Sequence, residues 1–244
     1  MIVARADGCI AGMAAALQTF RIVDESVRTS ALVSAGAVVD AGTQLGSIQG
    51  PARAILSAER VALNVLGHLS GVATATRALV DAVEGTGASI VDTRKTTPGL
   101  RFLEKRAVRA GGGENHRMGL YDAVLIKDNH VEAVGSPGEA VRRARGHVGD
   151  TTKVEVEIED LADLESVIEA GADIVMLDNM DSETIRTAVE LAAGRCVLEA
   201  SGGITLETVR EVAETGVDLI SVGWITHSAP TLDVALDFVV DRSL

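Results

Sequence analysis

The second half of the chain alternates short apolar runs with amphipathic stretches. Each run is bounded by glycine or polar residues, and segments of helical period separate the later runs. Six strands are predicted, at Ser89–Val91, Ala123–Ile126, Val154–Ile158, Ile174–Leu177, Cys196–Leu198 and Leu219–Val222. Six strands are too few for a complete β/α barrel, so either such a barrel is incomplete or one or two further strands lie within residues 102–120. Strands that alternate with helices predict a parallel sheet.

Cap signals bound the helices between the later strands. The three predicted helices run from Asp160 to Gly171, from Asp181 or Ser182 to Gly194, and from Thr205 to Gly216. Aspartate, serine and threonine suit the first position of a helix because their side chains accept a bond from a free backbone amide. Glycine suits the residue after the last turn.

The first 50 residues show a different pattern. Short β-branched runs lie between glycine turns, with one alanine-rich helical stretch at residues 12–20. The predicted strands are Met1–Ala4, Arg21–Asp24, Ser30–Val33, Ala37–Val39 and Leu45–Ile48. This pattern predicts a small, partly antiparallel module.

A long helix is predicted to begin at Pro51, a residue suited to the first turn. We expect an interruption at Ser70 and Gly71. The helix carries the chain into a second domain. We therefore predict an N-terminal domain over residues 1–63, joined by residues 230–244, and a catalytic domain over residues 64–229.

Polar residues follow the predicted strands at their carboxyl ends. The groups are Asp92 to Lys95, Lys127 to His130, Glu157, Asp178 with Asn179, Glu199, Ser201 to Gly203, and Gly223. In a β/α barrel this rim is where the chemistry takes place, whereas an open doubly wound sheet binds its ligand only near a switch point. The pattern therefore favours a β/α barrel, complete or incomplete.

Composition narrows the function class. The chain has 244 residues, 47% of them hydrophobic, a net charge of −13 and only 2% aromatic residues. A strongly acidic chain with few aromatic rings is a poor candidate for nucleic-acid binding. No apolar run is long enough to span a bilayer, and no clear signal peptide is present, so we expect a cytoplasmic protein. The two cysteines, Cys9 and Cys196, are expected to be buried free thiols.

Positive charge is gathered between Asp92 and His130. These 39 positions hold eight of the 22 lysine and arginine residues and two of the five histidines. Clustered cations of mixed type in an acidic protein predict a cleft for a small molecule that bears several carboxylates or phosphates.

The last two strands are followed by glycine loops. Ser201, Gly202 and Gly203 precede a predicted helix, and Gly223 follows the next strand. Backbone amides at such a loop and helix start can hold a phosphate. Each glycine alone is explained as well by a tight turn. The pair of loops at the end of a barrel favours a phosphate site.

Glu157 and Asp178 project from adjacent strand ends. They can hold Mg²⁺ shared with ligand oxygens, grip sugar hydroxyls, or act as a general acid and base as in a glycosidase. Glu155 shares the orientation of Glu157 by strand alternation, so one of the two is expected to be structural. The chain lacks the serine-nucleophile motif GxSxG, the zinc-protease motif HExxH and the P-loop motif GxxxxGK[ST]. The rival chemistry is a Schiff base formed by Lys95 or Lys127.

Six motifs together resemble one family. They are DTRKTTPGLRFLEKRAVRAGGGENHRMGL, LIKDNH, VEVE, MLDN, LEASGGI and SVGWITHS. The chain resembles quinolinate phosphoribosyltransferase from about Ala4 to its end. The resemblance implies an incomplete β/α barrel with a small N-terminal α/β sandwich domain. It also implies a homodimer.

The resemblance implies a reaction as well. Quinolinate and phosphoribosyl diphosphate, with Mg²⁺, would give nicotinate mononucleotide, diphosphate and CO₂ in NAD synthesis. No covalent enzyme intermediate is required, which fits the missing nucleophile.

Site residues follow from the resemblance. The implied catalytic residues are Lys95, Lys127, Glu157 and Asp178, and the last two would meet the metal directly or through substrate and water. The implied substrate-binding residues are Arg60, Thr93, Arg94, Lys95, His116, Arg117, Lys127, Glu157, Asp178, Ser201, Gly202, Gly203, Val222, Gly223 and Trp224. Arg60 of one subunit would reach the site of its partner.

The chain departs from the family pattern twice. Family members usually begin with a further segment of some tens of residues, and a misplaced start or a trimmed chain is the expected explanation. Trp224 stands where the family usually has a small residue beside the phosphate loop. Two alternative functions therefore stay open: a paralogue that acts on another heterocycle, and a truncated binding protein without turnover.

Overall fold

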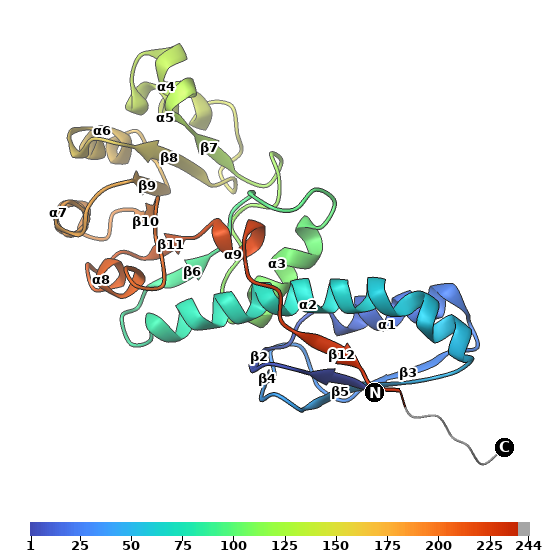
Figure 1. The fold of residues 1–244 in the computed structure, drawn as a ribbon. Coiled ribbons are helices and arrows are strands. Elements are labelled where there is room, and N and C mark those ends of the chain that lie inside the picture. Colours follow the sequence, from blue (N-terminus) through green and yellow to red (C-terminus); the bar gives the residue numbers. More distant parts are fainter. Residues whose placement is uncertain (239–244) are drawn as a thin grey trace. The chain divides into compact units, whose positions relative to one another are not determined.

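The computed structural model describes residues 1–238 in two compact units (Figure 1). The first unit comprises Met1–Ala78, Lys95–Gly113 and, of the described residues, 224–238. The second comprises Leu79–Arg94 and Glu114–Gly223. The predicted domain boundary at residues 63 and 64 falls inside a helix. Of the predicted C-terminal addition to the first domain, residues 239–244 lie outside the described part.

The first unit contains a four-stranded antiparallel sheet in the order β12-β1-β5-β3. A separate pair of strands, β2 and β4, is also antiparallel. The strands are β1 (Ile2–Ala4), β2 (Gly8–Cys9), β3 (Arg28–Ala31), β4 (Val38–Val39), β5 (Gln44–Gln49) and β12 (Val234–Leu236). The helices are α1 (Met13–Val23), α2 (Ala52–Ala82, which ends in the second unit), α3 (Arg101–Ala110) and α9 (Trp224–His227). One buried core joins the sheet to α1 and α2.

The predicted strand at Arg21–Asp24 is wrong, because α1 continues to Val23. Met13, Leu17 and Phe20 are buried at helical spacing. Ile22, 75% exposed, lies on the outer face of the last turn. The amphipathic period of the helix therefore outweighs the local β preference of Ile22 and Val23.

The predicted interruption of the long helix is also wrong. Helix α2 is continuous over Ser70 and Gly71. A Cβ atom on Gly71 would lie 2.1 Å from the Pro230 carbonyl oxygen, and one on Gly67 would lie 2.8 Å from the Leu232 carbonyl oxygen. These glycines allow a later segment of the chain to pack against the helix backbone.

Substituting Gly71 by alanine is expected to destabilise the protein, although alanine is the better helix former. The added methyl group has no room beside Pro230, so the free energy of unfolding should fall by about 2 kcal/mol. Urea denaturation measures the change. Asn64→Ala, on the exposed face of the same helix, is the control and should be neutral or slightly stabilising. A stabilised Gly71→Ala variant would contradict the close approach.

The second unit contains six parallel strands in the order β6-β11-β10-β9-β8-β7. They are β6 (Ser89–Val91), β7 (Val124–Ile126), β8 (Val154–Ile158), β9 (Ile174–Asp178), β10 (Val197–Ser201) and β11 (Leu219–Ser221). Helices connect most of them: α4 (Asp128–Val134), α5 (Pro137–Arg145), the short 3-10 helix η1 (Leu161–Asp163), α6 (Leu164–Glu169), α7 (Ser182–Ala192) and α8 (Val209–Ala213). All six predicted strands are confirmed, and the unit is an incomplete β/α barrel (Figure 1).

No named strand forms in residues 102–120, so of the two alternatives the incomplete barrel is confirmed and the further strands are wrong. The segment contains helix α3 and one isolated bridge between Val91 and Glu114. The apolar residues there follow a helical period: in α3 Ala107 and Val108 are buried, whereas Phe102 is exposed.

Two of the predicted helix starts are confirmed and one is displaced. Asp181 accepts a bond from the Thr184 amide at 2.8 Å, and Asp160 accepts one from the Ala162 amide at 2.9 Å. The helix predicted from Thr205 begins four residues later, at Val209. The Thr205 amide donates to the Thr208 hydroxyl, so a turn replaces the first helical residues.

Two further observations concern the cysteines and the membrane. Both cysteines are free, and Cys9 is buried, but Cys196 is only half-buried, contrary to expectation. No helix within residues 1–238 has the length and apolar character needed to cross a membrane.

Candidate active site

Polar side chains gather where the parallel strands of the second unit end. Asp92 follows β6, Lys127 follows β7, and Glu157 lies one residue before the end of β8. Asp178 ends β9 and is paired in register with Ser201, which ends β10. The carboxyl ends of parallel strands meet at one edge of a sheet, so the predicted rim is present.

Asp92 fixes the segment that carries the central cations. Its side chain is fully buried. One oxygen accepts a hydrogen bond from the His116 amide at 3.0 Å, and the other accepts one from the Asn115 side chain at 2.5 Å. The sequence placed Asp92 at a strand end, and the structure makes it the anchor of His116.

His116 lies between two buried glutamates of other strands. Its Nε2 atom is 2.8 Å from Glu155 Oε2 and 3.4 Å from Glu199 Oε2. Glu155 and Glu199 are both almost fully buried. The sequence placed Glu199 at a strand end and left either Glu155 or Glu157 as a structural residue. Nothing in the sequence joined these acids to a histidine on a distant segment.

The three side chains perturb each other's protonation. Burial lowers the pKa of His116, but the contacts with Glu155 and Glu199 outweigh it, and the pKa rises from 6.5 to about 10. Burial and the neighbouring Glu199 carboxylate also raise the pKa of Glu155. The cluster therefore holds more protons at neutral pH than three separate side chains.

Arg94 and Arg117 bring two positive charges together. The Arg117 Nη1 atom donates to the Ala123 carbonyl at 3.3 Å, and Arg94 Nη1 donates to the Gly119 carbonyl at 3.4 Å. Burial and the nearby Arg94 guanidinium lower the pKa of Arg117. Two like charges in a partly buried place are unfavourable for folding alone.

The loop between them is held by an aspartate. Asp122 accepts hydrogen bonds from the Met118 amide at 2.5 Å and the Gly119 amide at 2.9 Å. Burial alone would raise the pKa of Asp122, but these amides and, after them, the charge of Arg117 outweigh it and lower the pKa. The loop geometry therefore rests on the Asp122 carboxylate together with the bonds from Arg94 and Arg117 to the loop carbonyls.

Lys127 and Glu157 form a direct pair. The Lys127 Nζ atom lies 2.6 Å from Glu157 Oε2. The Lys127 side chain is 47% exposed and that of Glu157 only 11%. The sequence predicted both as site residues, and the structure brings them into contact.

Asp178 leads into a tight loop beside the glycines. Asn179 has a φ of 54°, and its side chain donates to the Asp178 carboxylate at 2.6 Å. Gly202 has a φ of 99°, and a Cβ atom there would lie 2.2 Å from the Asn179 side-chain oxygen. Gly202 and Gly203 are exposed residues of the loop that follows β10. Only glycine fits at position 202.

The remaining predicted site residues of the second unit, Thr93, Val222 and Gly223, have small or apolar side chains. Thr93 and Gly223 are half-buried. Val222 is 2% exposed, and its amide donates to the Val91 carbonyl at 3.0 Å. Val222 therefore shapes the backbone of the loop after β11.

Three predicted site residues belong to the first unit: Arg60, Lys95 and Trp224. Lys95 is exposed, and its carbonyl accepts a bond from the Thr226 hydroxyl at 2.8 Å. Trp224 is half-buried at the start of α9. This hydrogen bond fixes the backbone at Lys95 to helix α9 within the first unit.

Arg60 lies on the exposed side of α2. Its neighbours Leu56 and Val61 are 59% and 56% exposed. A charged residue beside large exposed apolar side chains is typical of a surface that binds another protein.

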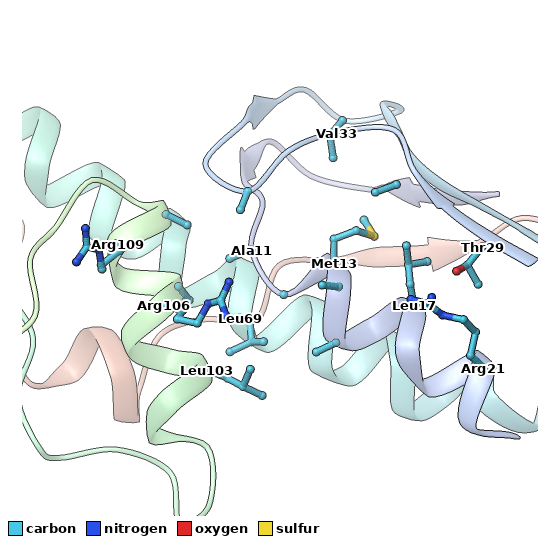
Figure 2. A pocket seen from close by; sticks show the side chains of 17 residues that line it. Ala11, Met13, Leu17, Arg21, Thr29, Val33, Leu69, Leu103, Arg106 and Arg109 are labelled. Carbon is cyan, nitrogen blue, oxygen red and sulfur yellow. The ribbon is translucent and has the colours of Figure 1, made fainter. Parts of the chain in front are cut away.

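A cavity of about 790 Å³ lies in the first unit. Figure 2 shows Met13 and Leu17 of α1 and Leu103 and Arg106 of α3 around it. Its walls are mostly apolar apart from Arg21, Arg106 and Arg109, and no carboxylate side chain lines it, in contrast to the strand ends. The strand ends are therefore the better candidate for chemistry.

The chain matches a known family along nearly its whole length. The N-terminal domain of quinolinate phosphoribosyl transferase matches residues 1–70, and the C-terminal domain matches residues 72–237. A probable nicotinate-nucleotide pyrophosphorylase [carboxylating] of Bacillus subtilis is 47% identical over 99% of this chain and 83% of its own length. The corresponding protein of Mycobacterium leprae is 45% identical over 97% of this chain and 84% of its own length.

Solved structures agree with these matches. The NadC structure from Streptococcus pyogenes has a TM-score of 0.93 and 42% identity, and the alignment covers 97% of this chain and 84% of that one. The nicotinate-nucleotide pyrophosphorylase of Francisella tularensis has a TM-score of 0.93 and 40% identity, covering 96% and 83%. The rim of cations, carboxylates and glycines thus lies in a fold already seen in solved structures. The chain belongs to the quinolinate phosphoribosyltransferase family.

Proposed function

We propose that this chain transfers a phosphoribosyl group from phosphoribosyl diphosphate to quinolinate and removes one carboxylate as CO₂, giving nicotinate mononucleotide for NAD synthesis. The observation that carries the assignment of the site is the pairing of Arg94 with Arg117. Burial, and after it the charge of Arg94, lowers the pKa of Arg117, and a bound polyanion offsets both effects.

The cations hold the acid. Four side chains meet the two carboxylates of quinolinate and the diphosphate of the donor: Arg94, His116, Arg117 and Lys127. Lys95 is adjacent to Arg94 in the sequence. Two anionic reactants repel each other, so they react only where fixed positive charges hold them in one orientation. The ring nitrogen then attacks the ribose carbon, and diphosphate departs.

The carboxylates act on the ribose. As diphosphate leaves, positive charge develops at the ribose carbon, and Glu157 and Asp178 stabilise it. Their oxygens are also the ligands that Mg²⁺ prefers, and two carboxylates leave room for substrate oxygens and water in its shell. Bound Mg²⁺ supplies charge neutralisation for diphosphate. Chelation of Mg²⁺ should therefore stop turnover.

Loss of CO₂ follows from the first step. The ring nitrogen becomes a cation once the ribose is attached. The bond between the ring and the adjacent carboxylate breaks, its electron pair stays on the ring carbon beside that cation, and a proton takes the place of CO₂. The protein needs no nucleophile, in agreement with the absence of a nucleophile motif.

The glycine loops hold the 5′-phosphate. Ser201, Gly202 and Gly203 offer a hydroxyl and backbone amides, and the loop at Val222 and Gly223 completes the site. The exposure of Gly202 and Gly203 and the close approach of Asn179 to Gly202 support this role.

Gly202→Ala tests the phosphate loop. The added methyl group meets the Asn179 oxygen and is strained at a φ of 99°, so the KM for phosphoribosyl diphosphate should rise on the order of tenfold. Gly194→Ala is the control, because Gly194 also has a positive φ of 72° but open space around its Cβ position. Equal KM values for the two variants would contradict the phosphate role.

The working form is a homodimer in which Arg60 reaches the partner's site. The exposed Leu56 and Val61 beside Arg60 support this arrangement, since burial of such residues stabilises an interface.

An acceptor competition tests the proposed reaction. Quinolinate, nicotinate and nicotinamide are supplied together with phosphoribosyl diphosphate and Mg²⁺, and the nucleotides formed are separated. Nicotinate mononucleotide with release of CO₂ from quinolinate is expected. Preferred use of nicotinate or nicotinamide would favour a paralogue for another heterocycle, which the relatives described above do not support. Binding without product would favour a non-catalytic protein.

A further inference from the structure

The loop between β6 and α3 carries Lys95 and is held at successive residues by other segments of the first unit. The Lys95 carbonyl accepts a hydrogen bond from the Thr226 hydroxyl of α9 at 2.8 Å. The Thr96 hydroxyl accepts one from Arg101 Nε, at the start of α3, at 3.0 Å. The loop has no regular secondary structure of its own, so such bonds from outside give it its shape.

The next bond of this loop goes to a buried acid. The Thr97 backbone amide donates to Glu104 Oε2 at 3.0 Å. The other oxygen of the same carboxylate, Oε1, lies 2.7 Å from Nε2 of His68 on α2. Glu104 is fully buried, whereas the His68 side chain is 28% exposed. The carboxylate therefore joins the loop to a helix far away in the sequence.

Packing alone does not explain an acid at this position. Glu104 shares the buried face of α3 with Ala107 and Val108, three and four residues further along. A buried carboxylate is costly unless it is paired and hydrogen-bonded, and an apolar side chain of similar size is often the more stable choice. The two contacts that the carboxylate makes are what an apolar residue could not replace.

Lys95 is the residue that gains from a fixed loop. Its side chain is exposed, and it lies two residues before Thr97. Lysine is a compact point charge that suits a phosphate group, whereas the planar fork of arginine suits a carboxylate. A displacement of about 1 Å at a reacting group can cost on the order of a hundredfold in rate. The backbone that carries such a flexible side chain therefore has to be held.

We propose that Glu104, oriented by His68, is a positioning residue that fixes the loop at Thr97 and thereby sets the Lys95 ammonium group for the diphosphate of the donor. The proposal rests on the proposed function for the identity of that diphosphate. The attachment of the loop to Glu104 does not depend on turnover.

The attachment is measured without substrate, by the hydrogen exchange of the Thr97 amide in the full chain. Glu104→Gln keeps an oxygen that accepts from this amide, so its exchange rate should stay within about threefold of the wild type. Glu104→Leu keeps the buried volume but removes the acceptor, and should speed the exchange about tenfold or more. Equal exchange in all three proteins would overturn the proposal.

His68→Ala is the second variant, because a partly exposed histidine can be truncated even if Glu104→Leu does not fold. The carboxylate then loses the partner that orients it. The exchange of the Thr97 amide should rise by about threefold. An unchanged rate would contradict the role of His68.

Binding of inorganic diphosphate with Mg²⁺, measured by calorimetry, tests the positioning of Lys95. Lys95→Ala should weaken binding about tenfold or more, and Glu104→Leu roughly fivefold. Glu104→Gln should recover the affinity to within about twofold of the wild type. Glu25→Gln, in the exposed turn after α1, is the control.

The double variant separates positioning from a merely structural role. If Glu104 acts through Lys95, Glu104→Leu should change the affinity less than about twofold once Lys95 is already alanine. A further fivefold loss in that background would mean that Glu104 acts on the fold as a whole, and would overturn the proposal.

Kinetics extend the test to the reaction. Glu104→Leu should raise the KM for phosphoribosyl diphosphate roughly fivefold and change that for quinolinate less than about twofold. Equal rises would contradict the assignment of Lys95 to the diphosphate. A wild-type protein that binds diphosphate without turnover contradicts the proposed function, and the exchange and binding experiments then still decide the role of Glu104. A folded wild type that does not bind diphosphate would overturn the proposal itself.

Discussion

Replacing Arg117 by alanine is expected to lower kcat/KM for quinolinate by on the order of 10² to 10³, because a charged hydrogen-bond donor to the substrate carboxylate is lost. The loss should fall on quinolinate, with the KM for phosphoribosyl diphosphate nearly unchanged. Steady-state kinetics at saturating phosphoribosyl diphosphate and Mg²⁺ measure it. Relief of the repulsion with Arg94 should leave the variant at least as stable as the wild type.

The matched control is Arg143→Ala. Arg143 lies on α5 and pairs with Glu139 at the surface, so its loss removes a charge without touching the site. Arg117→Lys should recover part of the activity, since lysine keeps the charge but loses the planar fork. An Arg117→Ala variant within twofold of the control would show that this arginine does not bind the acid.

Replacing Lys127 by alanine is expected to reduce kcat by on the order of 10² or more. Two effects combine: the cation is lost, and Glu157, with which Lys127 pairs at 2.6 Å, loses its partner beside the ribose. Rapid-quench measurement of nucleotide formation separates this effect from product release. Lys153→Ala is the control, because Lys153 is 67% exposed and pairs with Asp173.

Lys127→Arg distinguishes the proposed role from the rival chemistry. Arginine keeps the positive charge and should restore part of the rate, but it cannot form a Schiff base. Two results together would contradict phosphoribosyl transfer through fixed charges: a Lys127→Arg variant no more active than Lys127→Ala, and a covalent adduct on Lys127 of the wild-type protein after borohydride treatment.

The local pattern of the sequence predicts the rim well. Each of the six parallel strands is a short apolar run with a polar residue at its end, so the positions of Lys127, Glu157 and Asp178 follow from the strand pattern alone. Their convergence at one edge follows from the parallel topology.

Long-range packing decides the features that the sequence did not predict. Gly71 resembles a helix breaker, but it allows Pro230 to approach the helix backbone from a segment far along the chain. The cluster of His116 with Glu155 and Glu199 joins three segments whose spacing carries no common period. Neither contact leaves a local pattern.

The most direct test of the central claim is the stoichiometry of one reaction mixture. Purified protein is incubated with quinolinate labelled in the carboxylate next to the ring nitrogen, phosphoribosyl diphosphate and Mg²⁺. The expected result is one labelled CO₂ and one diphosphate for each nicotinate mononucleotide formed, with none of the three when Mg²⁺ is chelated. A folded protein that releases neither CO₂ nor diphosphate, or that forms a nucleotide still bearing the label, would contradict the proposed function.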